Sequence, residues 1–445
     1  MLDIIRNRQE KCCDGVSRRG FLRIGTLSTA LTPLGIANLS LSDLTRIRAT
    51  TSKQQSNGLG KPTKSTSVVW LWLGGGPTHI ETFDPKMTAP VEFRSVTGAI
   101  PSKVPGMEFG GTFSKMAQVA DKMALVRSFA HRNSGHGGGT HWVMTGHNFV
   151  AADNGGGQKH PGIGSIMSHF RGLTTPTGLP SYVRFRQILG DGPAWLGPSY
   201  SPFDVQGKAK KNMQLRLRGE TLDERKTLLK ELDRFDRQLD KSGAMKGMDS
   251  FEQQAFELIM SKSKDVFDLK NENQKIRDLY GKGLGEELLI ARRLCEAGVG
   301  FVTIHYGGWD MHGGIEKAMK SRGQMLDHAV STFIADCAQR GLDQDILLVI
   351  TGEFGRTPRI NKGAGRDHWA PLSTLALAGG GLKMGQVVGQ SSSKAEIPKS
   401  APISPQDLMA TVFHVLGIPQ ELKVKDPTGR PTPFIDGGKP IAELI

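Results

Sequence analysis

Acidic and histidine side chains that can bind a metal ion follow one apolar stretch of the chain directly. Asp310 and His312 come just after residues 301–304, a β-branched and aromatic run with glycines on both sides. Such a run predicts a buried strand, so both side chains fall beyond its C-terminal end. A carboxylate and an imidazole two residues apart suit one metal ion. The other interpretation is an aspartate in a turn and a histidine bonded to backbone.

Two further groups of polar residues are expected at the same place. Glu353 and Arg356 follow the next predicted strand, and Asp367 and His368 precede a later one. Arg356 can hold an oxyanion with its planar guanidinium; alternatively it pairs with Glu353 on the surface, where such a pair adds little stability. Ligands of open α/β sheets bind outside the carboxyl ends of the strands, so we expect these side chains to gather at that edge.

Histidines are concentrated in residues 131–147, where four of the chain's 12 histidines alternate with glycines. A lone histidine is usually a satisfied core residue, but this density predicts the lining of a site. His136 and His141 belong to this group. Residues 140–145 are expected to begin a helix whose N-terminus points at the same edge of the sheet.

A glycine-rich loop follows the first predicted strand. Gly75 and Gly76 lie in this loop, and His79 comes shortly after it. Glycines let backbone N–H groups face an anion, so we expect an anion-binding loop. The spacing matches neither the Rossmann nor the Walker pattern, and no nucleotide site follows from it.

The order of the predicted elements indicates an α/β fold. An amphipathic helix precedes the strand at 301–304, and a second one separates it from the next strand. This alternation is typical of a parallel sheet, so we predict a doubly wound, mainly parallel sheet. Charged helical runs over residues 205–285 predict a helical insertion or cap. The predicted helices are 286–297 and 315–338, and the predicted strands are 67–73, 123–129, 301–304, 346–350 and 372–378.

Composition argues against several classes of protein. The 445 residues carry a formal charge of +14, and 38% of them are hydrophobic, which is enough for a large core. No recognition helix, zinc finger or aromatic-basic pattern accompanies the charge, so we expect no nucleic acid partner, and an anionic substrate or surface fits it. The four cysteines suggest neither a disulfide framework nor a cysteine zinc cage.

The N-terminal residues predict export. Residues 17–23, SRRGFLR, are similar to the twin-arginine export signal, and the apolar stretch that follows is too short and too polar to span a membrane comfortably. We expect a leader at 1–45, a linker at 46–66 and a folded domain at 67–445. The twin-arginine route carries folded proteins, which predicts a location in the periplasm or cell envelope.

Seven stretches of the chain resemble an uncharacterised, twin-arginine-exported bacterial family of the alkaline phosphatase and sulfatase superfamily. The resemblance implies an alkaline phosphatase-like fold with metals at the C-terminal edge of its sheet. It implies that Asp310, His312 and His368 bind the first metal, with Asp367 as a further candidate. Mixed histidine and carboxylate ligands suit zinc or manganese better than magnesium. The stretches are SRRGFLRIG, WLGGGPTHIETFDPK, HGGGTHWVMTG, WDMHGG, TGEFGRTPR, GRDHW and SPQDLMATVFHVLGIP.

The superfamily's second metal site is altered in this chain. Its ligands are an aspartate after the first strand and an Asp-His pair after the strand that ends here at Ile350. In this chain, residues 74–76 are all glycine and stand in place of the aspartate after the first strand. Glu353 and Phe354 stand in place of the Asp-His pair. We therefore expect one firm divalent-metal site.

The superfamily's serine or threonine nucleophile has no obvious counterpart. It is expected near residues 134–140, where Ser134, His136 and Thr140 are all candidates. One metal can still activate a water for direct attack, with Glu353 or a histidine as the base.

Two functions of different classes fit these observations. The first is an exported metal-dependent hydrolase of a phosphate or sulfate ester, on an anionic small molecule or a glycan. In it, Arg356 and the loops that carry Gly75, Gly76, His79 and His141 hold the anion. The alternative is a non-catalytic envelope protein of the same fold that binds an anionic glycan or a protein partner.

Overall fold

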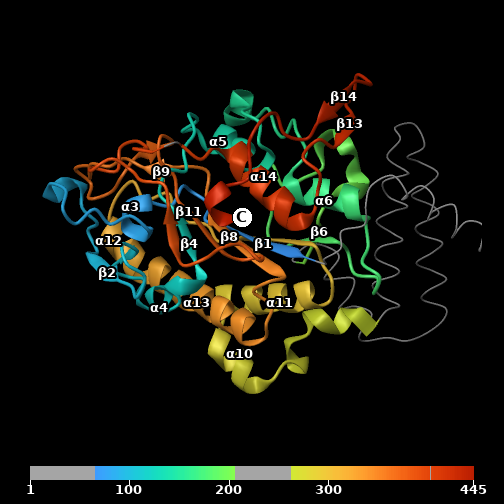
Figure 1. Cartoon of the computed structure of the whole chain (residues 1–445), viewed down its shortest axis with the longest axis horizontal. Coiled ribbons are helices and arrows are strands. Elements are labelled where there is room, and N and C mark those ends of the chain that lie inside the picture. The colour runs from blue at the N-terminus through green and yellow to red at the C-terminus, as the bar shows by residue number, and fades with distance from the viewer. Residues whose placement is uncertain (1–65, 206–261, 401) are drawn as a thin grey trace, which may run out of the picture. The chain divides into compact units, whose positions relative to one another are not determined.

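The computed structural model describes residues 66–205, 262–400 and 402–445 (Figure 1). The predicted leader, nearly all of the predicted linker and most of the predicted helical insertion lie outside the described residues, so these domain boundaries stay predictions. Among the described residues, no helix combines the length and the apolar character that a membrane span needs.

An eight-stranded sheet forms the centre of the described domain, in the order β12-β4-β11-β8-β1-β7-β5-β6. Neighbouring strands run parallel except at β11, which is antiparallel to both β4 and β8. The predicted mainly parallel α/β sheet is therefore confirmed. The strands are β1 Ser67–Trp72, β4 Ala124–Val126, β5 Tyr182–Arg184, β6 Phe203–Asp204, β7 Phe301–His305, β8 Ile346–Thr351, β11 Leu375–Gly379 and β12 Gln386–Val388.

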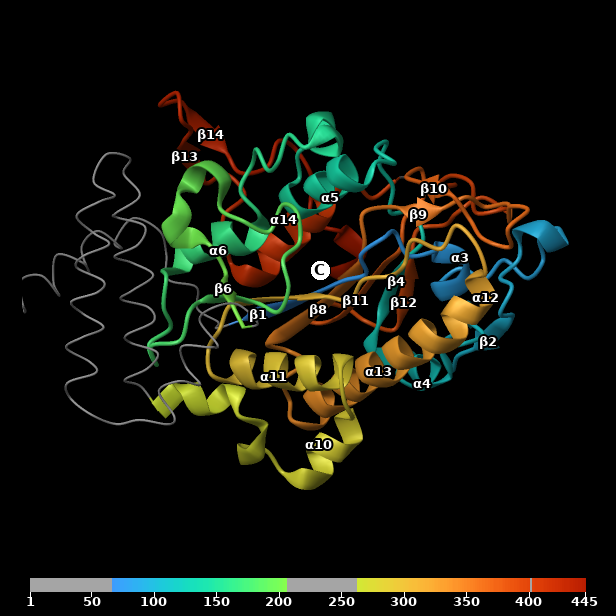
Figure 2. The same cartoon turned by 180° about the vertical axis from the view of Figure 1, so that it is seen from behind.

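Helices cover both faces of this sheet, as a doubly wound fold requires (Figures 1 and 2). Apolar residues of the helices and strands form one buried cluster on each face. On one face lie α4 Ser114–Gln118, α10 Gln274–Tyr280, α11 Leu284–Glu296 and α13 Gln324–Gln339. On the other lie α5 His136–Thr145, α6 Ile163–Arg171 and α14 Pro405–Leu416.

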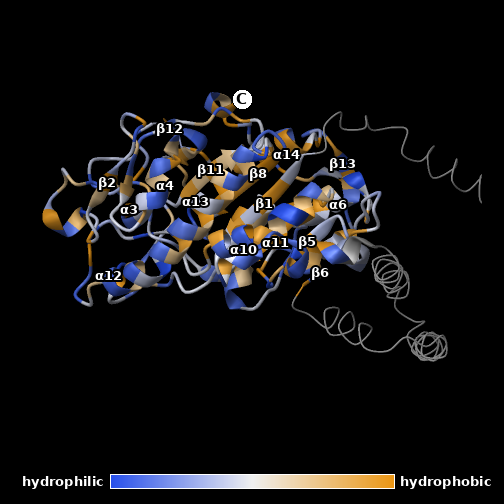
Figure 3. Ribbon diagram, turned by 90° about the horizontal axis from the view of Figure 1, so that it is seen from below, coloured by the Kyte–Doolittle hydropathy of each residue, from blue (hydrophilic) through white to orange (hydrophobic). Residues whose placement is uncertain are grey.

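The central strands are apolar because both of their faces are covered. Every residue of β1 is buried, and Figure 3 shows β1 and β8 as apolar beneath helices with hydrophilic outer sides. Parallel strands buried on both faces read as continuous apolar runs, which is why the sequence pattern detects them. The predicted helix at 315–338 is present as α12 Ile315–Ala318, a π-helical turn at Met319–Gly323, and α13.

Smaller elements lie beside the sheet. The helix α3 His79–Thr82 follows the glycine loop and is capped by the side chain of Thr78. A two-stranded ribbon joins β9 Gly355–Arg356 to β10 His368–Trp369, and it pairs Arg356 directly with His368. Two more ribbons form from β2 Ala99–Pro101 with β3 Glu108–Gly110, and from β13 Lys423–Lys425 with β14 Pro431–Pro433.

The register of the central strands brings their C-terminal ends together. Trp72, at the end of β1, pairs with His305 of β7 on one side and Thr351 of β8 on the other. The loops after these three strands therefore begin at one edge of the sheet. The predicted helix after residue 140 begins earlier, at His136, which places that residue in the first turn of α5.

Candidate metal centre

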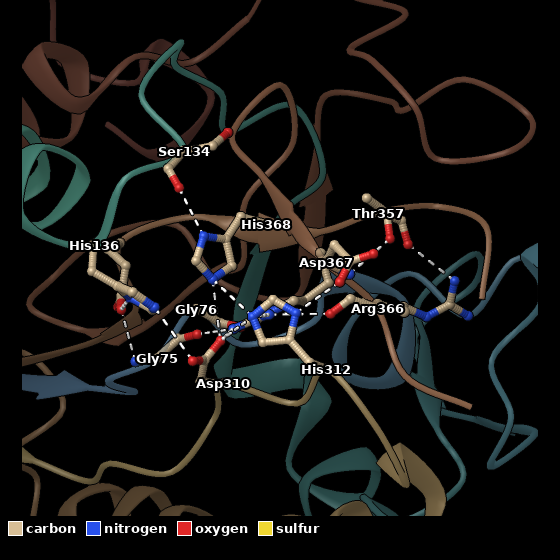
Figure 4. A network of polar contacts seen from close by, with 12 residues as sticks. Gly75, Gly76, Ser134, His136, Asp310, His312, Thr357, Arg366, Asp367 and His368 are labelled. Atoms are coloured by element: carbon tan, nitrogen blue, oxygen red, sulfur yellow. Dashed lines mark hydrogen bonds and ion pairs between the residues drawn. The ribbon is translucent and has the colours of Figure 1, made fainter. Parts of the chain in front are cut away.

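Three side chains meet beyond the ends of the central strands (Figure 4). Asp310 and His312 come from the loop after β7, and His368 comes from β10. Oδ1 of Asp310 lies 3.0 Å from Nε2 of His312 and 3.2 Å from Nε2 of His368. The two Nε2 atoms lie 3.1 Å apart. The three predicted ligands thus form one small triangle of nitrogen and oxygen atoms.

The outer nitrogen of each ring is held by an oxygen atom. Nδ1 of His312 lies 2.7 Å from Oδ1 of Asp367, and Nδ1 of His368 lies 2.9 Å from the carbonyl oxygen of Ser134. A carbonyl oxygen only accepts hydrogen bonds, and so does an ionised carboxylate. Both Nδ1 atoms therefore carry the proton, and each Nε2 presents a lone pair to the triangle.

His136 adds a third ring with the same arrangement. Its Nδ1 lies 2.8 Å from Oε1 of Glu353, which also accepts a hydrogen bond of 2.8 Å from the backbone N–H of Gly75. Its Nε2 lies 3.4 Å from Oδ2 of Asp310. One ligand atom each of His136, Asp310 and His368 lie within 4.8 Å of one another. The cluster of Asp310, His136, His312 and His368 is called the histidine–aspartate cluster below.

A metal ion fits this donor set. Lone pairs that converge at about 3 Å repel one another unless a cation lies between them. Ligand atoms of a tetrahedral zinc ion with bonds of about 2.0–2.1 Å lie about 3.3 Å apart, close to the sides of the triangle. Metal-binding histidines also typically donate their other N–H to a carboxylate or a carbonyl, as His312 and His368 do here.

The charges around Asp310 favour its ionised form. Burial alone would raise the pKa of Asp310, but the hydrogen bond and charge of Arg356, with help from the histidines, lower it to about 2. Burial lowers the pKa of His368, whereas the hydrogen bond to Glu353 raises the pKa of His136. An ionised Asp310 and a neutral His368 are the forms that bind metals.

Asp367 lies on the outer side of His312. Its Oδ1 contacts Nδ1 of His312, its own side chain is 56% exposed, and the hydrogen bond from His312 lowers its pKa. This position makes Asp367 an orienting partner of His312, because the ring stands between the carboxylate and the triangle. The predicted role of Asp367 as a direct ligand gains no support from it.

Arg356 is fully buried and uses its guanidinium inside the protein. Its Nη2 lies 2.5 Å from Oδ1 of Asp310 and also donates to the carbonyl oxygen of Gly75. Its Nε donates to the carbonyl oxygen of Gly76 over 2.8 Å, and its Nη1 donates to the carbonyl oxygen of Arg366 over 3.1 Å. A carboxylate has about four lone-pair sites, so Asp310 can serve Arg356 and a metal together. Arg356 thus fixes Asp310 to the glycine loop instead of facing outward toward an anion.

The glycine loop packs too tightly to carry side chains. Gly75 has a φ of +114°, and a Cβ there would lie 2.4 Å from the backbone N of Asp310. Gly76 has a φ of +79°, and its Cβ would lie 2.3 Å from the ring of Phe354. Both glycines are therefore explained by close approach to the cluster, and the N–H of Gly75 is already taken by Glu353.

The two hydroxyl candidates for a nucleophile are directed elsewhere. Oγ of Ser134 accepts a hydrogen bond of 3.0 Å from the backbone N–H of Ala370, and Figure 4 shows it pointing away from the rings. Oγ1 of Thr140 donates to the carbonyl oxygen of His136 over 2.6 Å, inside helix α5. The contribution of Ser134 comes instead from its carbonyl group, which no side-chain motif reveals.

His79 and His141 lie outside the histidine–aspartate cluster. His79 is buried, and its Nε2 lies 3.1 Å from the carbonyl oxygen of Ala395. His141 is fully buried, and its Nδ1 lies 2.8 Å from the carbonyl oxygen of His147. Their predicted role in anion binding gains no support, because both rings are enclosed by other parts of the fold.

His131 belongs to the histidine-rich segment that was predicted to line the site, and in the structure it holds a backbone group of the site in place. Its Nε2 donates to the backbone carbonyl oxygen of Glu353 over 2.7 Å, and burial lowers its pKa to about 4. His131 therefore stays neutral and fixes the backbone of the residue that holds His136.

The fold and this cluster define an α/β protein with a candidate centre for one metal ion. A family model described as "Protein of unknown function (DUF1501)" matches residues 65–445, so the chain belongs to the DUF1501 family. The comparison with curated proteins found no match.

Several solved structures are similar to the chain at low identity. The PsFucS1 sulfatase from Pseudoalteromonas sp. is 12% identical over 86% of this chain and 73% of its own, with a TM-score of 0.38. The alkaline phosphatase from the Antarctic bacterium TAB5 is 13% identical over 81% of this chain and 100% of its own, with a TM-score of 0.37. The phosphonate monoester hydrolase SpPMH from Silicibacter pomeroyi is 13% identical over 82% and 76%, with a TM-score of 0.31. Similarity at this level assigns no activity.

Proposed function

We propose that the chain is a metal-dependent hydrolase of a phosphate or sulfate ester, with one metal in the histidine–aspartate cluster. The observation that carries this proposal is the triangle of Asp310, His312 and His368, whose three acceptor atoms converge at 3.0 to 3.2 Å. The class of ester comes from the sequence resemblance.

In this proposal, the residues of the cluster have different roles. Asp310, His312 and His368 would hold the metal, which when bound would supply Lewis-acid polarisation of an ester oxygen. His136 takes a proton from the attacking water at Nε2, and Glu353 holds its Nδ1–H and stabilises the charged ring. The side chains of His136, His312 and Asp310 are each almost half exposed, which leaves the cluster open to a substrate.

An alternative function is favoured by one specific observation. Arg356, whose guanidinium contacts Asp310 of the cluster, is fully buried and bonded to Asp310 and to backbone carbonyls. An Arg356 that is bonded in this way directs no N–H group at a substrate oxyanion. The alternative is a non-catalytic envelope protein of the same fold that binds an anionic glycan or a protein partner.

We also propose that the protein is exported in folded form to the periplasm or cell envelope. The support is the SRRGFLR stretch at residues 17–23, which lies outside the described residues. Replacing Arg18 and Arg19 with lysine should keep the protein in the cytoplasm, as measured by immunoblots of cell fractions. Unchanged fractionation of this variant contradicts the proposal.

The first experiment is the metal content of the purified protein by elemental mass spectrometry. We expect about one zinc or manganese per chain in the wild type and almost none in His368→Ala. His414→Ala is the matched control, because His414 lies exposed on α14. A folded wild type that takes up neither added metal excludes the hydrolase.

Turnover then separates the two functions. The metal-loaded wild type is assayed on 4-nitrophenyl phosphate and 4-nitrophenyl sulfate, beside His136→Ala. We expect turnover of one ester and a loss of about 10²-fold or more in kcat in His136→Ala, the size usual for a general base. Metal-loaded wild type that turns over no ester but binds a sulfated or phosphorylated glycan supports the alternative.

A further inference from the structure

A polar cleft runs along β12, the outermost strand on one side of the sheet, and reaches the C-terminal end of that strand. It has a volume of about 660 Å³, within the range of small-molecule sites. Three basic side chains line it, those of Lys86, Arg127 and Lys399, together with Gln390 and two serines. None of the described residues that line it is acidic. Its charge therefore favours an anionic ligand.

A buried carboxylate fixes two of these cations beneath the cleft. Asp84 is 4% exposed, and its Oδ1 lies 3.2 Å from Nζ of Lys86 and 3.4 Å from Nε of Arg127. Ser391 donates a hydrogen bond to the other oxygen of the same carboxylate. One negative charge thus lies beside two positive ones, which leaves a net positive charge at the cleft. The nitrogens of Arg127 also donate to the carbonyl oxygens of Phe83, Gly106 and Glu108, so Lys86 and Lys399 supply the donors for a ligand.

Lys399 and the backbone conformation of Lys86 also contribute to the cleft. Lys399 is exposed, so its ammonium adds a second positive charge to the excess. Lys86 has a φ of +52°, in the left-handed region that residues other than glycine rarely adopt. Such backbone persists where its surroundings hold it, often at ligand sites. Here the ion pair with Asp84 holds the side chain of Lys86 at the cleft.

The part of the cleft that Arg127 and Gly389 line lies at the same edge of the sheet as the histidine–aspartate cluster. Arg127 directly follows β4, and Gly389 follows β12, which runs parallel to β4. Both strands run in the direction of β1, since β11 is antiparallel to β4 and to β8. With strands about 4.8 Å apart, β4 lies about 14 Å from β1 and about 19 Å from β7.

We propose that this cleft binds a second sulfate or phosphate group of an extended, polyanionic sugar chain whose reacting ester lies at the cluster. The inference rests on the proposed function, because it assumes that an ester reacts at the cluster. Because the strands that lead to the two sites are about 14–19 Å apart, a ligand that reaches both sites is an extended chain and not a simple monoester. The serine hydroxyls and the amide of Gln390 suit sugar hydroxyls better than an apolar ligand.

The test measures binding of a fluorescently labelled heparin-derived octasaccharide by anisotropy, in the full-length protein with its metal. The cleft variant combines Lys86→Asn with Lys399→Gln; asparagine tolerates a positive φ. The control is Lys394→Gln, a lysine of the same loop whose ammonium lies over the ring of Phe93. We expect the cleft variant to bind about tenfold more weakly or worse, and the control to bind like the wild type.

The possible outcomes separate this inference from the proposed function. Unaltered metal content with weakened octasaccharide binding in the cleft variant supports the cleft. Wild-type binding that the cleft variant leaves unchanged overturns it, even if esters are hydrolysed at the cluster. A third outcome is a wild type that turns over no ester but binds the octasaccharide more tightly than the cleft variant does. This outcome supports the anion-binding cleft and contradicts only the proposed hydrolase activity. Inorganic phosphate at millimolar concentration should compete with the octasaccharide, and failure to compete contradicts a sulfate or phosphate subsite.

Discussion

Two histidines of α5, His136 and His141, belong to different groups of histidines and differ in what their Nε2 atoms contact. In the histidine–aspartate cluster, His136 turns Nδ1 to an acceptor and presents Nε2 to Asp310. In the second group, both nitrogens of His141 have partners within the protein. Its Nδ1 lies 2.8 Å from the carbonyl oxygen of His147, and its Nε2 accepts backbone N–H groups of Lys159 and His160 over 3.1 and 3.3 Å.

Helical geometry sends the two residues to different sides of α5. Five residues on an α-helix correspond to a rotation of about 500°, or about 140° beyond one full turn. His136 therefore faces the cluster, while His141 is buried beside His147 and His160, whose rings stack with centroids 3.9 Å apart. A dense run of histidines thus identifies a site poorly, and the partner of each Nε2 identifies it well: that of His136 faces Asp310, and that of His141 accepts backbone N–H groups.

The sharpest contrast is expected from alanine at His141. His141→Ala removes a fully buried ring and leaves the N–H groups of Lys159 and His160 without their acceptor. We expect a loss of about 2–4 kcal/mol in the free energy of unfolding, measured by urea denaturation of the metal-free protein. The metal content of the folded variant should be unchanged.

The matched variant for this comparison is His312→Ala. Its ring is 48% exposed, so the metal-free protein should lose little stability while metal is lost. A His141→Ala protein that folds normally but lacks metal would show that the two groups of histidines are not separate.

An intermediate effect is expected at Asp367, which orients His312 without entering the triangle. Asp367→Ala leaves Nδ1 of His312 without its acceptor, and we expect metal affinity to fall by about 10–100-fold. Competition with a chelator of known affinity measures it. Asp367→Asn should lose less, because its amide oxygen still accepts. Equal metal affinity in Asp367→Ala and wild type would refute the orienting role.

The smallest effect concerns pH and the second group of histidines. Burial, with the nearby charges of His147, His141 and Lys159, lowers the pKa of His160 to about 4. The unfolded chain therefore binds more protons between about pH 6.5 and 4. Stability is complete above about pH 6.5 and declines as the pH falls toward 4.

His160→Gln should flatten this decline, as measured by urea midpoints of the metal-free protein at pH 7.5 and 5. Because the ring is only partly buried, solvent weakens the effect, and we expect a difference below about 1 kcal/mol. A steeper decline in the variant would mean that His160 is charged in the folded protein.

The sequence predicts the sheet well because its strands are buried on both faces. β1, β7 and β8 appear as predicted, within one or two residues. The predicted strand at 123–129 is present as Ala124–Val126, and beyond it Phe129 forms an isolated parallel bridge with Ile403. Short strands such as β5 and the edge strand β6 carry too few residues to produce a pattern.

The start of α5 shows how tertiary contacts override local preference. Three consecutive glycines after His136 argue against a helix there. Packing requires them, since a Cβ at Gly138 would lie 2.2 Å from Asn133, and one at Gly139 would lie 3.0 Å from the carbonyl oxygen of Glu353. The side chain of Asp153 accepts the N–H of Gly138 over 2.7 Å and holds the first turn.

The residues of the candidate site separate in the same way. Asp310, His312 and His368 are predictable from residue type at the ends of strands, and the structure brings them together. The directions of Arg356 and Ser134 are not predictable, because each depends on which backbone groups of distant loops lie nearby. Their catalytic or anion-binding roles stay predictions.

The bond between Gly75 and Glu353 has a consequence for how the protein matures. Its two residues are separated by 278 positions in the chain. Contacts between such distant segments form late in folding, because long loops must close first. A nascent chain that ends before His368 lacks one corner of the triangle. The three predicted metal ligands can therefore meet only in a chain that has been synthesised beyond His368.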